Sequence, residues 1–316
     1  MIVTEESGGT NLRIAIAIAT AGRPHILKDA LTQLTKQSRL PDAVYICATS
    51  ALDVAGVDTE GVPIRILYGP RGSCSQRNVI IDRAASEDLI VFFDDDFFPH
   101  ADYLQRLEEI FLKHRDVVVC TGLVIADGVV GPGLSVDEAR AILAADNVVQ
   151  SSALTLQDVY NGYGCNMAVR ADTIRQNGIV FDEALPLYGW LEDVDFSRRL
   201  SVHGRIVQAA NTRGVHLGDK KGRQKGILLG YSQIANPVYL AKKRTLSWPR
   251  ALKQIGRNVG ANCLKSIAPE PYIDRRGRIL GHALALVHLC LGKMDPRRVL
   301  EFQDFSVRNS KEPLDL

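Results

Sequence analysis

The chain has 316 residues, which is enough for one large domain with an appendage or for two modest domains. Its hydrophobic content of 46% and charged content of 23% are ordinary for a folded globular protein. The formal net charge of +2 gives no general case for a nucleic-acid partner.

The six cysteines form no C-x-x-C pair and have no histidines at metal-ligand spacing beside them. We therefore expect reduced thiols and a cytoplasmic location, not a disulfide framework or a zinc site. Residues 1–11 are acidic and polar, so no signal peptide is expected. The longest weakly polar runs, 117–130 and 279–292, are shorter than the roughly 20 residues that a membrane-spanning helix needs.

Short apolar runs alternate with helical spacing in the N-terminal third of the chain. Residues 14–20, 43–47, 64–67 and 89–93 are predicted strands, and residues 75–84 are a predicted helix. Leu27, Leu31 and Leu34 also recur at helical spacing. Such alternation predicts an α/β fold with a parallel, doubly wound sheet, in which ligands bind at the carboxyl ends of the strands.

The pattern is more mixed in the second half. Residues 166–169 and 206–209 are predicted strands, and residues 192–202 are a predicted helix. Beyond residue 218 the composition becomes rich in Lys, Arg and Gly, beginning with the basic run 220–225. We therefore expect a catalytic domain over residues 12–218 and a basic helical region over residues 219–316.

Three consecutive carboxylates, Asp94, Asp95 and Asp96, follow the strand predicted at residues 89–93. Adjacent acids repel one another unless a cation lies among them. Residues two apart on a strand point the same way, so Asp94 and Asp96 can share one partner while Asp95 faces another. Carboxylate oxygens at this place suit Mg²⁺ or Mn²⁺. An acidic surface turn is the alternative.

A second acidic pair, Glu192 and Asp193, opens the helix predicted at residues 192–202. The positive end of the helix dipole favours carboxylates there and is expected to keep Asp193 ionised. Acids in a first helical turn are also common as helix stabilisers. Trp190 offers a face on which an acceptor sugar can stack beside Glu192, and Asp193 offers a proton acceptor for a sugar hydroxyl.

Together these residues resemble glycosyltransferase family 2, whose members have the GT-A fold and use nucleotide-sugar donors. The resemblance covers residues 12–218 and lies in five short segments in order, at residues 14–24, 71–78, 94–96, 164–167 and 192–193. It implies a GT-A fold: a Rossmann-like, mostly parallel sheet flanked by helices, with a C-terminal helical appendage.

The resemblance also implies donor-binding residues. Thr20 and Arg23 border the nucleotide base, and Arg77 approaches the nucleotide or its diphosphate. Asp94 and Asp95 contact the ribose or the metal. A helix-surface arginine is the alternative for Arg77.

The same resemblance implies a metal site and a catalytic base. Asp96 is the principal ligand of Mn²⁺ or Mg²⁺, with Asp94 beside it and His216 as a further ligand. Asp193 is the base. A lone histidine is more often a structural residue, so both roles stay open for His216.

One segment departs from the family pattern. Members often end their second strand with an acidic residue that contacts the base, whereas residues 45–50 read YICATS here. Either the backbone with Thr49 or Ser50 holds the base, or base recognition differs. Uridine diphosphate is therefore only the family default.

The implied reaction is inverting transfer of a sugar to a hydroxyl of a saccharide or lipid-linked acceptor, in polysaccharide or glycoconjugate biosynthesis. Asp193 removes the proton from that hydroxyl in a single displacement, and positioning and electrostatics supply most of the rate enhancement. A metal-dependent nucleotidyltransferase and a non-catalytic sugar- or nucleotide-binding module are the alternatives. The former ordinarily has a lysine-containing, Gly-rich loop after its first strand, which residues 20–24 lack.

The basic C-terminal region has two interpretations. It is either peripherally bound to the inner face of an anionic membrane or a packing appendage with a solvated basic face. In the membrane interpretation the helix expected over residues 248–267 places apolar residues toward the membrane and basic residues at the rim: Trp248, Leu252, Ile255 and Leu264 against Lys253, Arg257 and Lys265.

Overall fold

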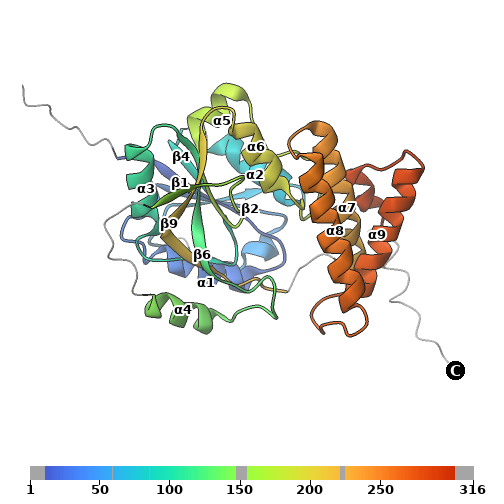
Figure 1. Ribbon diagram of the computed structural model, residues 1–316. Coiled ribbons are helices and arrows are strands. Elements are labelled where there is room, and N and C mark those ends of the chain that lie inside the picture. Colours follow the sequence, from blue (N-terminus) through green and yellow to red (C-terminus); the bar gives the residue numbers. More distant parts are fainter. Residues whose placement is uncertain (1–10, 59, 85, 147–154, 221–224, 303–316) are drawn as a thin grey trace, which may run out of the picture.

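A nine-stranded sheet forms the centre of the computed structural model, which describes residues 11–58, 60–84, 86–146, 155–220 and 225–302 (Figure 1). The strand order is β3-β2-β1-β4-β8-β6-β9-β5, and β7 pairs with β9 outside this path. The strands are β1 (Ile14–Ala19), β2 (Ala43–Ala48), β3 (Ile64–Tyr68), β4 (Leu89–Asp94), β5 (Phe97–Pro99), β6 (Val117–Asp127), β7 (Leu156–Asp158), β8 (Asn166–Arg170) and β9 (Arg205–His216).

The first four strands form the parallel half of the sheet. β1 lies between β2 and β4, and β2 also pairs with β3. Strands β1, β2 and β4 are buried along nearly their whole length, which explains their continuous apolar runs. Because parallel strands end at one edge, Thr20 after β1 and Asp94 at the end of β4 lie close together. The predicted α/β class and these four strands are confirmed.

The second half of the sheet is mixed. β8 runs antiparallel to both β4 and β6, whereas β6 and β9 are parallel. The apolar pattern predicts only residues 206–209 of β9, because polar residues at 211–213 interrupt it. In the structure β9 continues through this stretch with shifted register against β6. The extension places His216 opposite Phe97, directly after the acidic triad.

Helices cover both faces of the sheet (Figure 1). They are α1 (Pro24–Leu34), α2 (Ser73–Arg83), α3 (Tyr103–Lys113), α4 (Val136–Ala145), α5 (Ala171–Asn177) and α6 (Glu192–Leu200), with a 3-10 turn, η1 (Ala51–Val54). Phe92 of β4 packs edge-on against Phe196 of α6 on one face. On the other face Ile16 of β1 belongs to the same apolar cluster as Leu27 of α1 and Leu107 of α3.

The C-terminal region is helical, as predicted. It consists of α7 (Gly226–Lys243), α8 (Trp248–Lys265), α9 (Arg275–Cys290) and a 3-10 turn, η3 (Pro296–Phe302). The three long helices lie side by side beyond the sheet (Figure 1). Ile255 packs against the apolar cluster of α7, unlike exposed Trp248, Leu252 and Leu264.

The basic run that precedes α7 is only partly described. Four of its residues, 221–224, lie outside the described part of the chain, and a domain boundary after residue 218 remains a prediction. None of the described helices combines the length and the apolar character needed to cross a membrane.

A buried carboxylate joins the C-terminal helices to the sheet domain. Asp195 of α6 has a side chain only 1% exposed. Lys243, the last residue of α7, lies 2.8 Å from Asp195 Oδ2, and Thr245 donates a 2.7 Å hydrogen bond to Oδ1. Arg199 adds a contact of 2.9 Å. This network fixes α6 against α7.

We predict that Asp195→Ala lowers the free energy of unfolding by about 1–3 kcal/mol, because Arg199 and Thr245 lose their buried acceptor and Lys243 keeps only its ion pair with Asp182. Urea denaturation measures the change. Asp158→Ala is the matched control, since Asp158 forms an exposed pair with Arg205 that is worth about 1 kcal/mol or less. Equal losses in the two variants would show that the Asp195 network does not stabilise the fold.

Candidate active site

The acidic triad ends β4 with its side chains divided between two environments. Asp95 is fully buried and accepts a 2.7 Å hydrogen bond from the Thr20 hydroxyl. It also forms an ion pair with Arg23. Burial raises the pKa of Asp95 to about 7, although Arg23 opposes the shift. Asp95 therefore contacts the loop after β1 through Thr20 and Arg23, and its contact with the donor stays a prediction.

Asp94 and Asp96 share one partner, His216, as their alternation predicts. Asp96 Oδ2 accepts a 2.9 Å hydrogen bond from the Asp219 amide and lies 3.3 Å from Arg23 Nη1. Asp96 Oδ1 lies 3.3 Å from His216 Nε2. Burial disfavours the charged form of Asp96, but His216 and Arg23 outweigh it and lower the pKa of this carboxyl.

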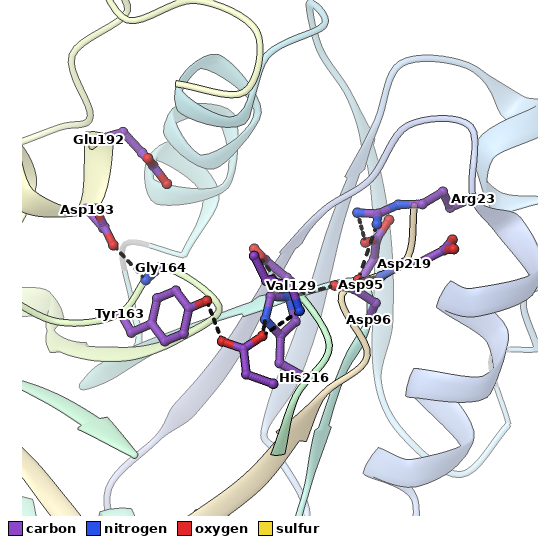
Figure 2. Close-up of polar contacts among 12 residues, drawn as sticks. Arg23, Asp95, Asp96, Val129, Tyr163, Gly164, Glu192, Asp193, His216 and Asp219 are labelled. Carbon is purple, nitrogen blue, oxygen red and sulfur yellow. Dashed lines mark hydrogen bonds and ion pairs between the residues drawn. The ribbon is translucent and has the colours of Figure 1, made fainter. Parts of the chain in front are cut away.

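His216, at the end of β9, is held by an acid that lies outside the predicted motifs. Asp127, the last residue of β6, lies 3.1 Å from His216 Nδ1 and accepts a 2.9 Å hydrogen bond from the Tyr163 hydroxyl (Figure 2). With Nδ1 engaged, Nε2 points toward Asp94 and Asp96. Burial lowers the pKa of His216, but Asp127 and Asp96 raise it overall to about 10. The sequence signal that could have identified Asp127 is its position as an acid at the end of the apolar run 117–126.

Asp94, Asp96 and His216 form a group whose potential ligand atoms all lie within 4.8 Å of one another. Two carboxylates and one imidazole suit Mn²⁺, and the carboxylates also suit Mg²⁺. A carboxylate behind a histidine ligand is the usual arrangement at metal sites, because it fixes the ring and its tautomer. The donor set and the Asp127 support therefore fit a divalent cation.

Arg77 of α2 connects the triad to the second acidic pair. Its guanidinium is 3.0 Å from Asp94 Oδ1 and 2.8 Å from Glu192 Oε1, and it donates a 2.9 Å hydrogen bond to the Gly164 carbonyl. Its side chain is 4% exposed. Arg77 thus holds two acidic groups together from inside the fold, and a direct contact with a diphosphate stays a prediction.

Glu192 and Asp193 occupy the first turn of α6, as predicted. The Gly164 amide donates a 3.1 Å hydrogen bond to Asp193 Oδ2 (Figure 2). Burial and the neighbouring Asp193 raise the pKa of Glu192 to about 8. Burial also raises the pKa of Asp193, although the amides of Gly164 and Val194 oppose this shift. The helix terminus that was expected to keep Asp193 ionised therefore competes with desolvation.

The aromatic residue predicted at the acceptor side has a partner. Trp190 and Tyr188 stack with their ring centroids 6.2 Å apart, and Tyr188 is 52% exposed. Asn236 of α7 donates a 2.8 Å hydrogen bond to the Trp190 carbonyl. Tyr188, which was not predicted as a site residue, is the more exposed of the two rings.

An acidic residue also lies shortly after the end of β2, near the segment that departs from the family pattern. Asp53 in η1 is buried and accepts hydrogen bonds from the amides of Gly22 (2.7 Å), Thr49 (3.0 Å) and Ser50 (2.9 Å). Burial opposes its ionisation, but these bonds and one from the Thr49 hydroxyl lower its pKa. Asp53 joins the loops after β1 and β2. The sequence signal that could have identified it is an acid three residues after Ser50, close to where the family has its acidic residue.

The two acidic groups lie on opposite sides of one site (Figure 2). Glu192 and Asp193 lie on one side, with Arg23, Asp96 and His216 on the other. The structure thus assembles the predicted residues at the carboxyl ends of β1 and β4, and the role of each residue stays a prediction.

The chain matches the family model for glycosyl transferase family 2 over residues 15–175, slightly more than half of its 316 residues. A comparison with curated protein sequences found no match.

Several solved glycosyltransferase structures are similar to this chain. Residues 1–349 of S. aureus TarS have 15% identity and a TM-score of 0.55, with 93% of this chain and 92% of that chain covered. GalNAc-T7 with UDP, GalNAc and Mn²⁺ has 14% identity and a TM-score of 0.57, covering 97% and 59%. The Pyrobaculum calidifontis mannosyltransferase PcManGT, with GDP-Man and Mn²⁺, has 13% identity and a TM-score of 0.51, covering 96% and 89%. At these identities the likeness shows the GT-A fold.

The raised pKa of Glu192 predicts a pH-dependent stability. A carboxyl whose folded pKa exceeds its unfolded value binds a proton on folding, so its contribution is present below about pH 4.5 and is lost as the pH rises through about 8. With divalent cations chelated, we expect the free energy of unfolding of the wild type to fall relative to Glu192→Gln between these pH values. Denaturant unfolding at several pH values measures this. Exposed Glu60→Gln is the control; a Glu192→Gln curve parallel to the wild type would show that Arg77 keeps Glu192 ionised throughout.

Proposed function

The chain belongs to glycosyl transferase family 2, and we propose that it transfers a sugar, with inversion, from a nucleoside-diphosphate sugar to a hydroxyl of a saccharide or lipid-linked saccharide acceptor. One observation carries the proposal: Arg77 joins the Asp94–Asp96–His216 group to the Glu192–Asp193 pair. A donor diphosphate and an attacking hydroxyl need acidic groups of these two kinds on the two sides of one site.

The donor lies, in this proposal, at the loops after β1 and β2. Thr20 and Arg23 border the base, and Asp95 holds both of them in place. Asp53 fixes the loop containing Gly22 against that containing Thr49. We propose UDP as the nucleotide because S. aureus TarS binds UDP-GlcNAc and GalNAc-T7 binds UDP, while PcManGT with GDP-Man makes a guanine nucleotide the alternative.

Asp96, Asp94 and His216 hold Mn²⁺ or Mg²⁺ in this proposal, and Asp127 keeps the His216 ring oriented. Either ion, when bound, supplies Lewis-acid stabilisation of the negative charge that grows on the departing diphosphate. Arg23 and Arg77 already partly balance the carboxylates, which keeps the acidic cluster compatible with an anionic donor.

Asp193 accepts the proton of the acceptor hydroxyl as that oxygen attacks the anomeric carbon from the side opposite the diphosphate. The Gly164 amide orients the Asp193 carboxylate, and Glu192 with Trp190 contacts the acceptor sugar. Inversion follows from a single displacement, so no glycosyl-enzyme intermediate is required.

The metal assignment predicts that Mn²⁺ strengthens diphosphate binding in the wild type and not in Asp96→Ala. Loss of supporting residues alone costs 10–100-fold in metal affinity, so loss of this ligand should cost at least about 100-fold. Calorimetry with UDP, in chelator and in Mn²⁺, measures the effect. Exposed Asp137→Ala is the control; equal UDP affinity in all conditions and in the variant would refute the metal site.

The base assignment predicts that Asp193→Asn lowers kcat by about 10²–10⁴, the usual contribution of a general base, while donor binding survives. Turnover with saturating donor measures it, and proton NMR of the product reports the anomeric configuration. Asp172→Asn, in the first turn of α5, is a matched control because it tests a helix-terminal acid outside the site. Turnover of Asp193→Asn close to that of the wild type would show that Asp193 is not the general base.

A further inference from the structure

Large apolar side chains are exposed along α8 and α9. Leu280 and Val287 of α9 and Leu291 directly after it follow helical spacing and are 54%, 54% and 60% exposed. Leu252 on α8 is 61% exposed, and Ile267, just beyond the end of α8, is 86% exposed. Large apolar side chains exposed on two helices that pack together are candidates for a contact site.

The same two helices carry more positive than negative charge. Their sequences contain four basic residues on α8 and three on α9 and no Asp or Glu, although Lys265 and Arg275 pair with Glu270 between the two helices. Lys253, Arg257 and Arg276 are exposed, and among the described residues they have no acidic partner. On α8, Lys253 follows Leu252 directly and Arg257 lies one turn further on, so the charges border the apolar residues.

The positive charge of these helices distinguishes between two candidate partners, a second copy of the chain and an anionic lipid surface. Two copies of the chain meeting through α8 and α9 would bring positive side chains together without counter-ions, and like charges across an interface are costly. An anionic lipid surface instead supplies negative headgroups for the rim and an apolar layer for the exposed leucines. We propose that the α8–α9 face, defined by Leu252, Ile267, Leu280, Val287 and Leu291 with Lys253 and Arg257, docks the protein on an anionic membrane.

Docking through this face constrains the active site. Asn236 of α7 binds the Trp190 carbonyl, and Lys243 of α7 binds Asp195 in the helix that begins with Glu192 and Asp193. α7 packs on both α8 and α9. The base is therefore tied to the docking face through packed helices. The benefit, access to an acceptor carried on a lipid, rests on the proposed function, whereas docking itself does not.

Vesicle sedimentation with the full chain tests the proposal. Vesicles of phosphatidylcholine with phosphatidylglycerol are compared with pure phosphatidylcholine vesicles at low and high salt. We expect binding to the anionic vesicles at low salt, weakening as salt rises because screening removes the attraction to the headgroups. Equal binding to both vesicles, or no binding to either, overturns the proposal.

Variants localise the contact. Leu280→Glu combined with Val287→Glu should weaken binding to anionic vesicles by about tenfold or more, and Lys253→Glu with Arg257→Glu should also reduce its salt dependence. Val130→Glu with Val202→Glu is the matched control, since both residues are 78–79% exposed outside the helical region. Vesicle binding unchanged in the α8–α9 variants, or lost equally in the control, contradicts the assignment of this face.

Two further readouts distinguish lipid docking from self-association and from donor binding. Light scattering that shows the wild type as a dimer and the Leu280/Val287 variant as a monomer, without vesicle binding, would make the face a self-interface and overturn the lipid proposal. Stabilisation by UDP with Mn²⁺ in a thermal-shift assay reports the donor site, which these variants do not touch. Membrane binding without nucleotide binding would refute the proposed function and leave docking standing.

Discussion

The buried guanidinium of Arg77 is the interaction on which the site depends. It contacts Asp94 at the end of β4, Glu192 at the start of α6 and the carbonyl of Gly164 before β8. These three segments are distant in sequence, and two of them carry carboxylates that repel each other. A cation between them, nearly removed from water, makes their approach favourable where repulsion alone would separate them.

The remaining carboxylates follow the same rule. Arg23 is the cation for Asp95 and Asp96, and His216 lies between Asp96 and Asp127. Opposite charges outweigh burial at Asp96, whereas burial prevails at Glu192. The pKa values of these two carboxyls are therefore shifted in opposite directions, and such perturbed pKa values are common at functional sites.

The helix that presents Asp193 is supported from outside the sheet. Asp195, two residues later, points away from the site toward Lys243 and Thr245. One turn of α6 thus contributes an acid to the site and another to the contact with α7. The C-terminal helices are consequently part of the support of the active site, and their own outer face remains uncovered by the described chain.

The sequence alone determined the α/β class, the strands with continuous apolar runs, the two acidic groups and the family, because these features depend on local periodicity and on the order of short motifs. It did not determine β5, which is only three residues long, or β6, whose apolar run fits a strand or a helix. It also missed the extension of β9, whose polar residues 211–213 lie in a strand only because neighbouring strands are present. Asp127 and Asp53 likewise acquire their roles through distant partners, His216 for Asp127 and the Gly22 amide for Asp53. Tertiary structure decided these points because ion pairing and burial depend on which distant groups the fold brings together. The local sequence does not reveal how close two such groups lie in space.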